Sequence, residues 1–245
     1  MPGFRAADGT ELAYRVQGAG PSLVCLAGGP MRDAAYLGDL GGLAARRQLI
    51  VPDQRGTGQS AIPADLASCR CDRLAADLEA LREHLGRDRL DLLGHSAGAS
   101  IAVHYAARYP RQVRRLVLVT PSTRAVGCPA TVAERRAVIR LRHREPGFAE
   151  QAAAFERIYA GREGDGDWAV LAPLTYGRWD AAARLHHAAR QDQQNPDAAL
   201  AFAAGAFDVA ATRAALAGFG APVLLLAGEL DFLTPVSREI GRAHV

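Results

Sequence analysis

Residues 91–100 read Asp91-Leu92-Leu93-Gly94-His95-Ser96-Ala97-Gly98-Ala99-Ser100. A short apolar strand, 90–93, leads into this stretch, and a helix-forming segment, 99–109, follows at once. Glycines two places before and after Ser96 leave almost no side chain around a sharp, strained turn that exposes the hydroxyl. The N–H groups and positive dipole end of the following helix would face an oxyanion formed there. The pattern predicts a nucleophile elbow; an idle serine in a tight turn is the alternative.

The composition of the chain bounds its class. The 245 residues suffice for one α/β domain with an inserted subdomain and a substantial core. All 29 basic residues are arginine, and the absence of lysine excludes a Schiff-base lysine, a P-loop lysine and pyridoxal chemistry. The net charge is +3 with both signs interleaved, so no nucleic-acid partner is expected.

Location and cofactors are bounded by what the chain lacks. We expect no membrane partner, because no apolar run is long enough to span a bilayer. Residues 1–3 begin no signal peptide, so we expect a cytoplasmic protein. The four cysteines are scattered, and Cys69-Arg70-Cys71 lacks zinc spacing, so neither a disulfide framework, a metal nor a cofactor is expected. The oligomeric state stays open.

Strands alternate with helices along most of the chain, which favours a mostly parallel sheet with helices on both faces. After an opening hairpin at 4–17, the expected strands are 22–26, 48–52, 90–93, 115–119 and 222–227, and the expected helices are 34–46, 74–85, 99–109 and 208–217. Between 122 and 205 the segments are helical and rich in Ala and Arg. We therefore expect an α/β core in two parts, 1–121 and 206–245, with 122–205 as an inserted helical lid.

A serine nucleophile needs a base, a group that orients the base, and an oxyanion hole. Asp231 follows the late strand and is the favoured acid; Glu229 is a weaker candidate, and a loop acid in a turn is the alternative. For the oxyanion hole we expect the N–H of Ala97 and a second N–H from Gly29 or Gly28, with Gly29 favoured. A plain turn is the alternative for these two glycines.

Three motifs together resemble the α/β-hydrolase superfamily, and more narrowly its proline iminopeptidase branch of serine peptidases. They are Ala27-Gly28-Gly29-Pro30, Asp53-Gln54-Arg55-Gly56-Thr57-Gly58-Gln59-Ser60 and Gly94-His95-Ser96-Ala97-Gly98. The resemblance covers about residues 10–121 and 206–238. It implies that an acyl-enzyme on Ser96 releases an N-terminal residue, often proline, from a peptide or small amide, without a cofactor. Family members usually have histidine at position 27 and glycine at position 31, which weakens the peptidase assignment more than the hydrolase one.

The resemblance also implies that lid acids hold the free amine of the substrate. Glu150, Glu156 and Asp180 are the possible counterparts, although a role as surface acids is favoured for each. A carboxylesterase or lactonase on the same scaffold is the runner-up, and a non-catalytic binding protein of this fold is the third interpretation. Fold analogy alone does not separate these functions.

Of the catalytic groups that a serine hydrolase needs, the general base is the one that the sequence does not provide in its expected place. In this fold a histidine follows the acid, after one more helix and strand. His244 is the one histidine after Asp231, but it falls before that expected strand. His95 adjoins the nucleophile, where neighbouring side chains diverge, and the paired His186 and His187 of the lid are a weak alternative. The remaining histidines, which also precede the acid, are His84, His104 and His143.

The last seven residues suggest why no histidine stands in the expected place. Residues 239–245 can be back-translated as GAG ATC GGA AGA GCA CAC GTC, which reads through as a widely used short-read sequencing adapter. The adapter continues with TGA, a stop codon. We therefore expect native sequence to end near Arg238, and the last strand of the fold and the catalytic histidine to be missing from this polypeptide, which should hydrolyse poorly. The strand at 222–227 should then form an exposed, aggregation-prone edge. A genuine short helix end is the alternative, and the source nucleotides decide between them.

Overall fold

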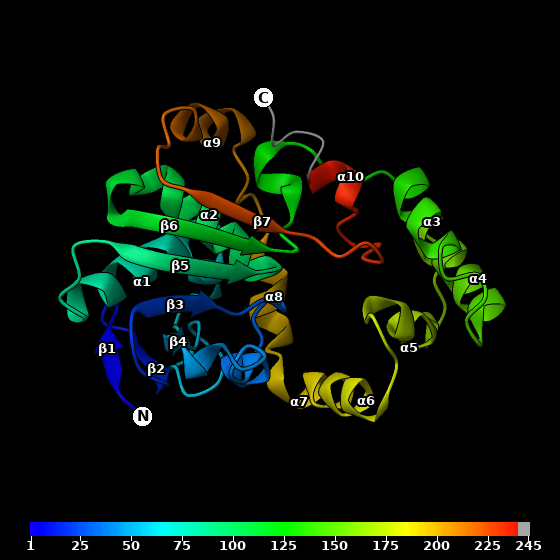
Figure 1. Ribbon diagram of the computed structural model, residues 1–245, viewed down its shortest axis with the longest axis horizontal. Helices are drawn as coiled ribbons and strands as arrows, with labels where there is room; N and C mark the ends of the chain where they lie inside the picture. The colour runs from blue at the N-terminus through cyan, green and yellow to red at the C-terminus, as the bar shows by residue number, and fades with distance from the viewer. Residues whose placement is uncertain (240–245) are drawn as a thin grey trace. The chain divides into compact units, whose positions relative to one another are not determined.

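The computed structural model describes residues 1–239 and divides the chain into two compact units (Figure 1). The first unit comprises residues 1–127 and 192–226, and the second comprises residues 128–191 and those from 227 onward. Residues 240–245 lie outside the described part. His244 and most of the segment interpreted as adapter sequence therefore receive no structural account.

A mostly parallel sheet forms the centre of the first unit. Within residues 1–239 it has seven strands in the order β1-β2-β4-β3-β5-β6-β7. The strands are β1 Gly3–Arg5, β2 Glu11–Gln17, β3 Ser22–Leu26, β4 Gln48–Pro52, β5 Leu90–His95, β6 Val113–Val119 and β7 Val223–Leu226. The opening hairpin pairs antiparallel, β2 pairs antiparallel with β4, and the remaining neighbours are parallel (Figure 1). This arrangement confirms the expected fold class.

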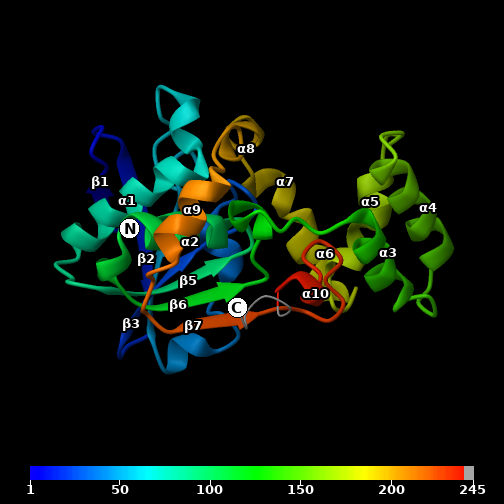
Figure 2. The same cartoon turned by 90° about the horizontal axis from the view of Figure 1, so that it is seen from above.

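Three helices pack against one face of the sheet (Figure 2): α1 Cys71–His84, α2 Ala97–Arg108 and α9 Val209–Leu216. Their apolar residues join those of the strands in one large core cluster, with Leu78, Leu92 and Ile101 among its buried members. Because central parallel strands are covered on both faces, they read as continuous apolar runs rather than alternating ones. That is why the sequence pattern located them well.

The other face carries shorter elements than expected. The helix predicted over 34–46 is wrong, because two 3₁₀ turns stand there, η1 Ala34–Leu37 and η2 Leu43–Ala45. Gly38, Gly41 and Gly42 lie between them with φ of 54°, 68° and 89°. These backbone angles are incompatible with a continuous right-handed helix.

The segment from 122 to 205 is helical, as the sequence indicates. Its elements are η5 Thr123–Val126, α3 Val132–Arg140, α4 Phe148–Tyr159, α5 Asp167–Leu171, η6 Ala172–Thr175, α6 Ala181–Ala188, α7 Arg190–Gln193 and α8 Pro196–Phe202. The second unit has an apolar cluster of its own, made of Ile139, Phe155, Ile158, Leu171, Leu174 and Phe232. The α10 helix begins at Val236 and is described as far as Glu239.

The remaining elements are short 3₁₀ turns, η3 Leu66–Cys69 and η4 Pro110–Gln112. Among residues 1–239, no helix combines the length and the apolar character needed to cross a membrane.

The outer strand β7 exposes Val223, Leu224 and Leu226 by 53%, 53% and 46%. Apolar side chains on an unpaired sheet edge are a template for association with other chains.

Candidate active site

Ser96 occupies the turn between β5 and α2 with φ of 52° and ψ of −115°. A non-glycine residue in this region is strained, and the surrounding structure must hold it there. Two backbone hydrogen bonds do so: the N–H of Ser96 donates to the oxygen of Val119 over 2.9 Å, and the N–H of Ala99 donates to the oxygen of Ser96 over 3.0 Å. The turn therefore has the strained geometry of a nucleophile elbow.

The flanking glycines are required by close backbone contacts. A β-carbon on Gly94 would lie 2.6 Å from Cα of Ala99. A β-carbon on Gly98 would collide with the carbonyl oxygens of Leu26 and Ala27 at the end of β3. The two glycines thus let the first turn of α2 pack directly on β3 and β5.

Two of the proposed oxyanion donors, Ala97 and Gly28, lie beside Ser96. Ala97 is the first residue of α2, so its N–H has no acceptor within the helix. A β-carbon built on Gly28 would lie 3.0 Å from Cβ of Ser96, which places the loop after β3 directly against the nucleophile. The N–H of Gly28 donates to the hydroxyl of Tyr36 over 2.6 Å, whereas Gly29 has φ of 130°, a conformation that favours glycine.

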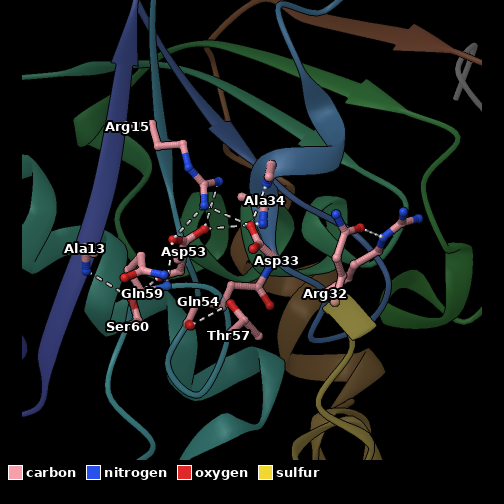
Figure 3. A network of polar contacts seen from close by, with 12 residues as sticks. Ala13, Arg15, Arg32, Asp33, Ala34, Asp53, Gln54, Thr57, Gln59 and Ser60 are labelled. Carbon is pink, nitrogen blue, oxygen red and sulfur yellow. Dashed lines mark hydrogen bonds and ion pairs between the residues drawn. The ribbon is translucent and has the colours of Figure 1, made fainter. Parts of the chain in front are cut away.

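The loop after β4 braces this oxyanion loop, defined as residues 27–34 (Figure 3). The side-chain amide of Gln54 donates to the oxygen of Ala27 over 2.7 Å. The carboxylate of Asp53 accepts from the N–H of Ala34 over 3.3 Å and from the N–H of Gln59 over 3.1 Å. Residues 53–60 therefore act by holding the backbone beside the nucleophile in place.

Asp53 is almost completely buried, and burial raises its pKa despite the nearby guanidinium of Arg15. Arg15 approaches Asp53 at 3.2 Å and Asp33 at 2.9 Å (Figure 3). The hydroxyl of Ser60 donates to the oxygen of Asp53 over 2.7 Å and accepts from the N–H of Ala13 over 3.0 Å. The conspicuous Asp and Ser of this motif thus tie β2 to the loop after β4.

Residues 193–195, which are remote in sequence, also form hydrogen bonds to the oxyanion loop. The oxygen of Gln193 accepts from the N–H of Asp33 over 2.8 Å, and the N–H of Asn195 donates to the oxygen of Met31 over 3.0 Å. The side-chain amide of Gln194 donates to the oxygen of Pro30 over 2.8 Å. Nothing in the sequence of residues 193–195 signals this role, since it depends on pairing across about 160 residues.

The proposed acid, Asp231, belongs to the second unit. Its carboxylate accepts from the N–H groups of Leu233 and Thr234 over 2.9 and 3.1 Å, and from the hydroxyl of Thr234 over 2.7 Å. These donors fix the carboxylate within its own turn. The weaker candidate, Glu229, is exposed in the same loop.

The three acids named as possible amine contacts all take part in local structure. Glu156 forms a two-pronged ion pair with Arg136. Asp180 caps α6 by accepting from the N–H of Ala183 over 2.9 Å. Glu150 is exposed in the first turn of α4, where a carboxylate complements the helix dipole. Each therefore has a structural role that does not require a bound amine.

The histidines within residues 1–239 fall into three settings. His84 and His95 contact tyrosine hydroxyls, those of Tyr14 and Tyr36. His104 is buried in α2, where burial lowers its pKa and its ring stacks on Phe207 with centroids 5.9 Å apart. The others lie in the second unit: His143 contacts the oxygen of Arg140, and His186 and His187 surround the ring of Tyr176.

Comparison with known proteins gives a family match and several similar sequences. A model of the alpha/beta hydrolase fold family matches residues 21–242. The proline iminopeptidase of Saccharolobus solfataricus is 37% identical over 128 residues, which cover 51% of this chain and 40% of that protein. The proline iminopeptidase of Heyndrickxia coagulans is 34% identical over 122 residues, covering 49% and 42%. Each match thus spans about two fifths of the relative's length.

Solved structures resemble the chain over more of its length. A proline iminopeptidase of Mycobacterium smegmatis gives a TM-score of 0.70 at 23% identity, with 96% of this chain and 83% of that chain covered. An esterase of Exiguobacterium antarcticum gives 0.68 at 20% identity, with 96% and 84% covered. At these identities the likeness establishes the fold and does not separate amide from ester substrates.

Proposed function

The chain belongs to the alpha/beta hydrolase fold family, and we propose that it carries a serine-hydrolase site with Ser96 as nucleophile. The main support for this proposal is the strained conformation of Ser96, with φ of 52° and ψ of −115°, between β5 and the first residue of α2. Strain at a polar residue that faces a glycine loop is typical of active sites.

The proposed reaction is acyl transfer. Ser96 Oγ attacks a carbonyl carbon, its proton passes to a base, and the carbonyl oxygen becomes an oxyanion facing the N–H of Ala97 and the glycine loop. Collapse expels the protonated amine or alcohol and leaves an ester on Ser96. Water then adds to this ester, the carboxylic acid departs, and the serine recovers its proton. Asp231 is the carboxylate proposed to orient a histidine base.

The narrower proposal is release of an N-terminal residue, often proline, from peptides or small amides. It rests on the similarity to proline iminopeptidases and on the shared motifs at residues 27–30 and 53–60. Ala27 and Met31 depart from the usual pattern of that branch. An ester or lactone substrate is therefore the outcome against which the amide proposal is tested.

The test begins with a fluorophosphonate, which forms a covalent bond with an activated serine and is detected by intact-protein mass spectrometry. We expect one adduct, located on Ser96, and none in Ser96→Ala. Ser100 is the matched control because it lies one helical turn further along α2 and is buried. Labelling that persists in Ser96→Ala, or that disappears equally in Ser100→Ala, contradicts the proposal.

Substrate class is tested separately, with prolyl p-nitroanilide and short p-nitrophenyl esters offered side by side. Because no general base is identified within residues 1–239, we expect this polypeptide to turn over substrate slowly. The iminopeptidase proposal predicts that the turnover seen is that of the anilide and depends on Ser96. Turnover confined to the esters favours the esterase alternative. A folded protein that neither labels nor turns over any substrate supports the non-catalytic binding interpretation instead.

A further inference from the structure

The hydroxyl of Tyr36 lies between the oxyanion loop and the elbow. It is 2.6 Å from the backbone nitrogen of Gly28 and 2.7 Å from Nδ1 of His95. Tyr36 follows the loop in η1, whereas His95 is the last residue of β5 and directly precedes the nucleophile. One hydroxyl group thus joins the two segments that form the walls of the proposed oxyanion hole.

Chemistry fixes the direction of one of these hydrogen bonds. The backbone nitrogen of Gly28 can only donate, so the phenolic oxygen accepts there. Toward Nδ1 of His95 the hydroxyl, with its one proton and second lone pair, can donate or accept, according to the tautomer of the ring. Burial raises the pKa of Tyr36 to about 12, so the phenol keeps that proton at any pH suitable for assay.

The ring of Tyr36 is held independently of its hydroxyl. The guanidinium carbon of Arg32 lies 4.5 Å from the centre of the ring, in a cation–π arrangement. Arg32 is itself buried, and its Nε donates to the side-chain oxygen of Gln193 over 2.9 Å. Replacing Tyr36 with phenylalanine therefore removes the two hydrogen bonds while preserving the packing of the ring.

The hydroxyl also lies close to the reacting group. The position of a β-carbon built on Gly28 is 3.0 Å from Cβ of Ser96 and 3.2 Å from the hydroxyl oxygen of Tyr36. The loop between them includes Gly29, whose φ of 130° lies in a region that only glycine adopts readily. A glycine loop of this kind needs external contacts to keep one conformation.

We propose that Tyr36 is a positioning residue, whose hydroxyl holds the oxyanion loop against the elbow through Gly28 and His95. In this arrangement the N–H of Gly28 is committed to Tyr36. This inference rests on the proposed role of Ser96, but the hydrogen bonds that it assigns can be tested without any catalytic activity.

The first experiment is nuclear magnetic resonance of the ¹⁵N-labelled full chain at pH 8. We expect the ring nitrogen signals of His95, assigned with His95→Gln, to shift in Tyr36→Phe, because Nδ1 loses its hydroxyl partner. In Tyr36→Phe the amide proton of Gly28 should move upfield, because it loses its acceptor. His95 ring signals or a Gly28 amide signal unchanged by the substitution overturn the proposal.

The second experiment measures fluorophosphonate labelling of Ser96 as a function of probe concentration. Loss of the hydroxyl should lower the maximal labelling rate about fivefold to tenfold, while the concentration for half-maximal rate stays constant. Tyr14→Phe is the matched control, because it removes another tyrosine–histidine contact, to Nε2 of His84 at 3.2 Å. An unchanged or faster rate in Tyr36→Phe overturns the positioning role.

The two experiments separate this inference from the proposed function. If the wild type is not labelled at all, the proposed nucleophile fails and the magnetic resonance result alone decides whether Tyr36 locks the loop. If labelling occurs and Tyr36→Phe matches Tyr14→Phe, Ser96 stands as nucleophile and the inference about Tyr36 fails.

Discussion

Arg55 and Asp77 form a two-pronged ion pair in which both side chains are largely buried. Nε of Arg55 lies 2.8 Å from one carboxylate oxygen of Asp77, and a terminal nitrogen of the guanidinium contacts the other. The second terminal nitrogen reaches Asp8 over 2.7 Å, and this bond lowers the pKa of Asp8 to about 2. The pair thereby ties the loop after β4, which supports the oxyanion loop, to α1.

Removing one partner should strand a buried charge. We expect Asp77→Ala to lower the free energy of unfolding by about 3 to 5 kcal/mol, measured by urea denaturation. The control is Arg73→Ala, which breaks an exposed contact with Asp65 at 3.8 Å and should cost less than about 1 kcal/mol. Equal losses in the two variants would show that the guanidinium finds other partners when Asp77 is absent.

The strained backbone of Ser96 predicts that the nucleophile costs stability. Ser96→Gly should raise the free energy of unfolding relative to Ser96→Ala by about 1 to 3 kcal/mol, because glycine adopts positive φ without strain. Ser100→Gly is the control: this residue lies in regular helix, where glycine destabilises by about 1 kcal/mol. Stabilisation absent at position 96 would argue that the turn relaxes in solution.

His104 predicts a loss of stability in acid. Burial lowers its folded pKa below the ordinary value of 6.5, so the folded state favours the neutral ring. The contribution is fully present above pH 6.5 and is lost as the pH falls through the folded pKa, with a slope of at most about 1.4 kcal/mol per pH unit.

Urea denaturation at several pH values between 8 and 5 measures this slope. His104→Phe, which can retain stacking on Phe207, should lose stability less steeply than the wild type. His143→Gln alters an exposed histidine and should keep the wild-type slope. A His104→Phe profile parallel to that of the wild type would assign the acid sensitivity to carboxylates instead.

The exposed strand β7 predicts self-association. Leu224 and Leu226 line a groove of about 260 Å³ on the sheet face, together with Leu93 and Val117. Leu224→Lys should reduce concentration-dependent aggregation, measured by size-exclusion chromatography with light scattering, because a charge on an edge strand opposes pairing. Leu200→Lys, on α8, replaces an even more exposed leucine and should have little effect. A larger reduction of aggregation by Leu200→Lys would show that α8, rather than β7, forms the associating surface.

Local sequence patterns located the elements that depend on nearest neighbours. The apolar runs predicted β3, β4 and β5, and the Gly-x-Ser-x-Gly spacing placed Ser96 on a strained turn. The helix expected over 34–46 failed because its apolar spacing suggested a helix, whereas Gly38, Gly41 and Gly42 interrupt it. There backbone conformation outweighed apolar periodicity.

By itself, the sequence determined the alternation of strands and helices and the residues of the elbow. Both depend on residues close together in the chain: the first on hydrophobic periodicity, the second on glycines beside Ser96. Only the tertiary structure decided what supports the elbow. Gln54 reaches Ala27, Tyr36 reaches His95, and Gln194 reaches Pro30. A hydrogen bond constrains position in space over about 3 Å, whatever the separation along the chain, so such partners leave no local signal.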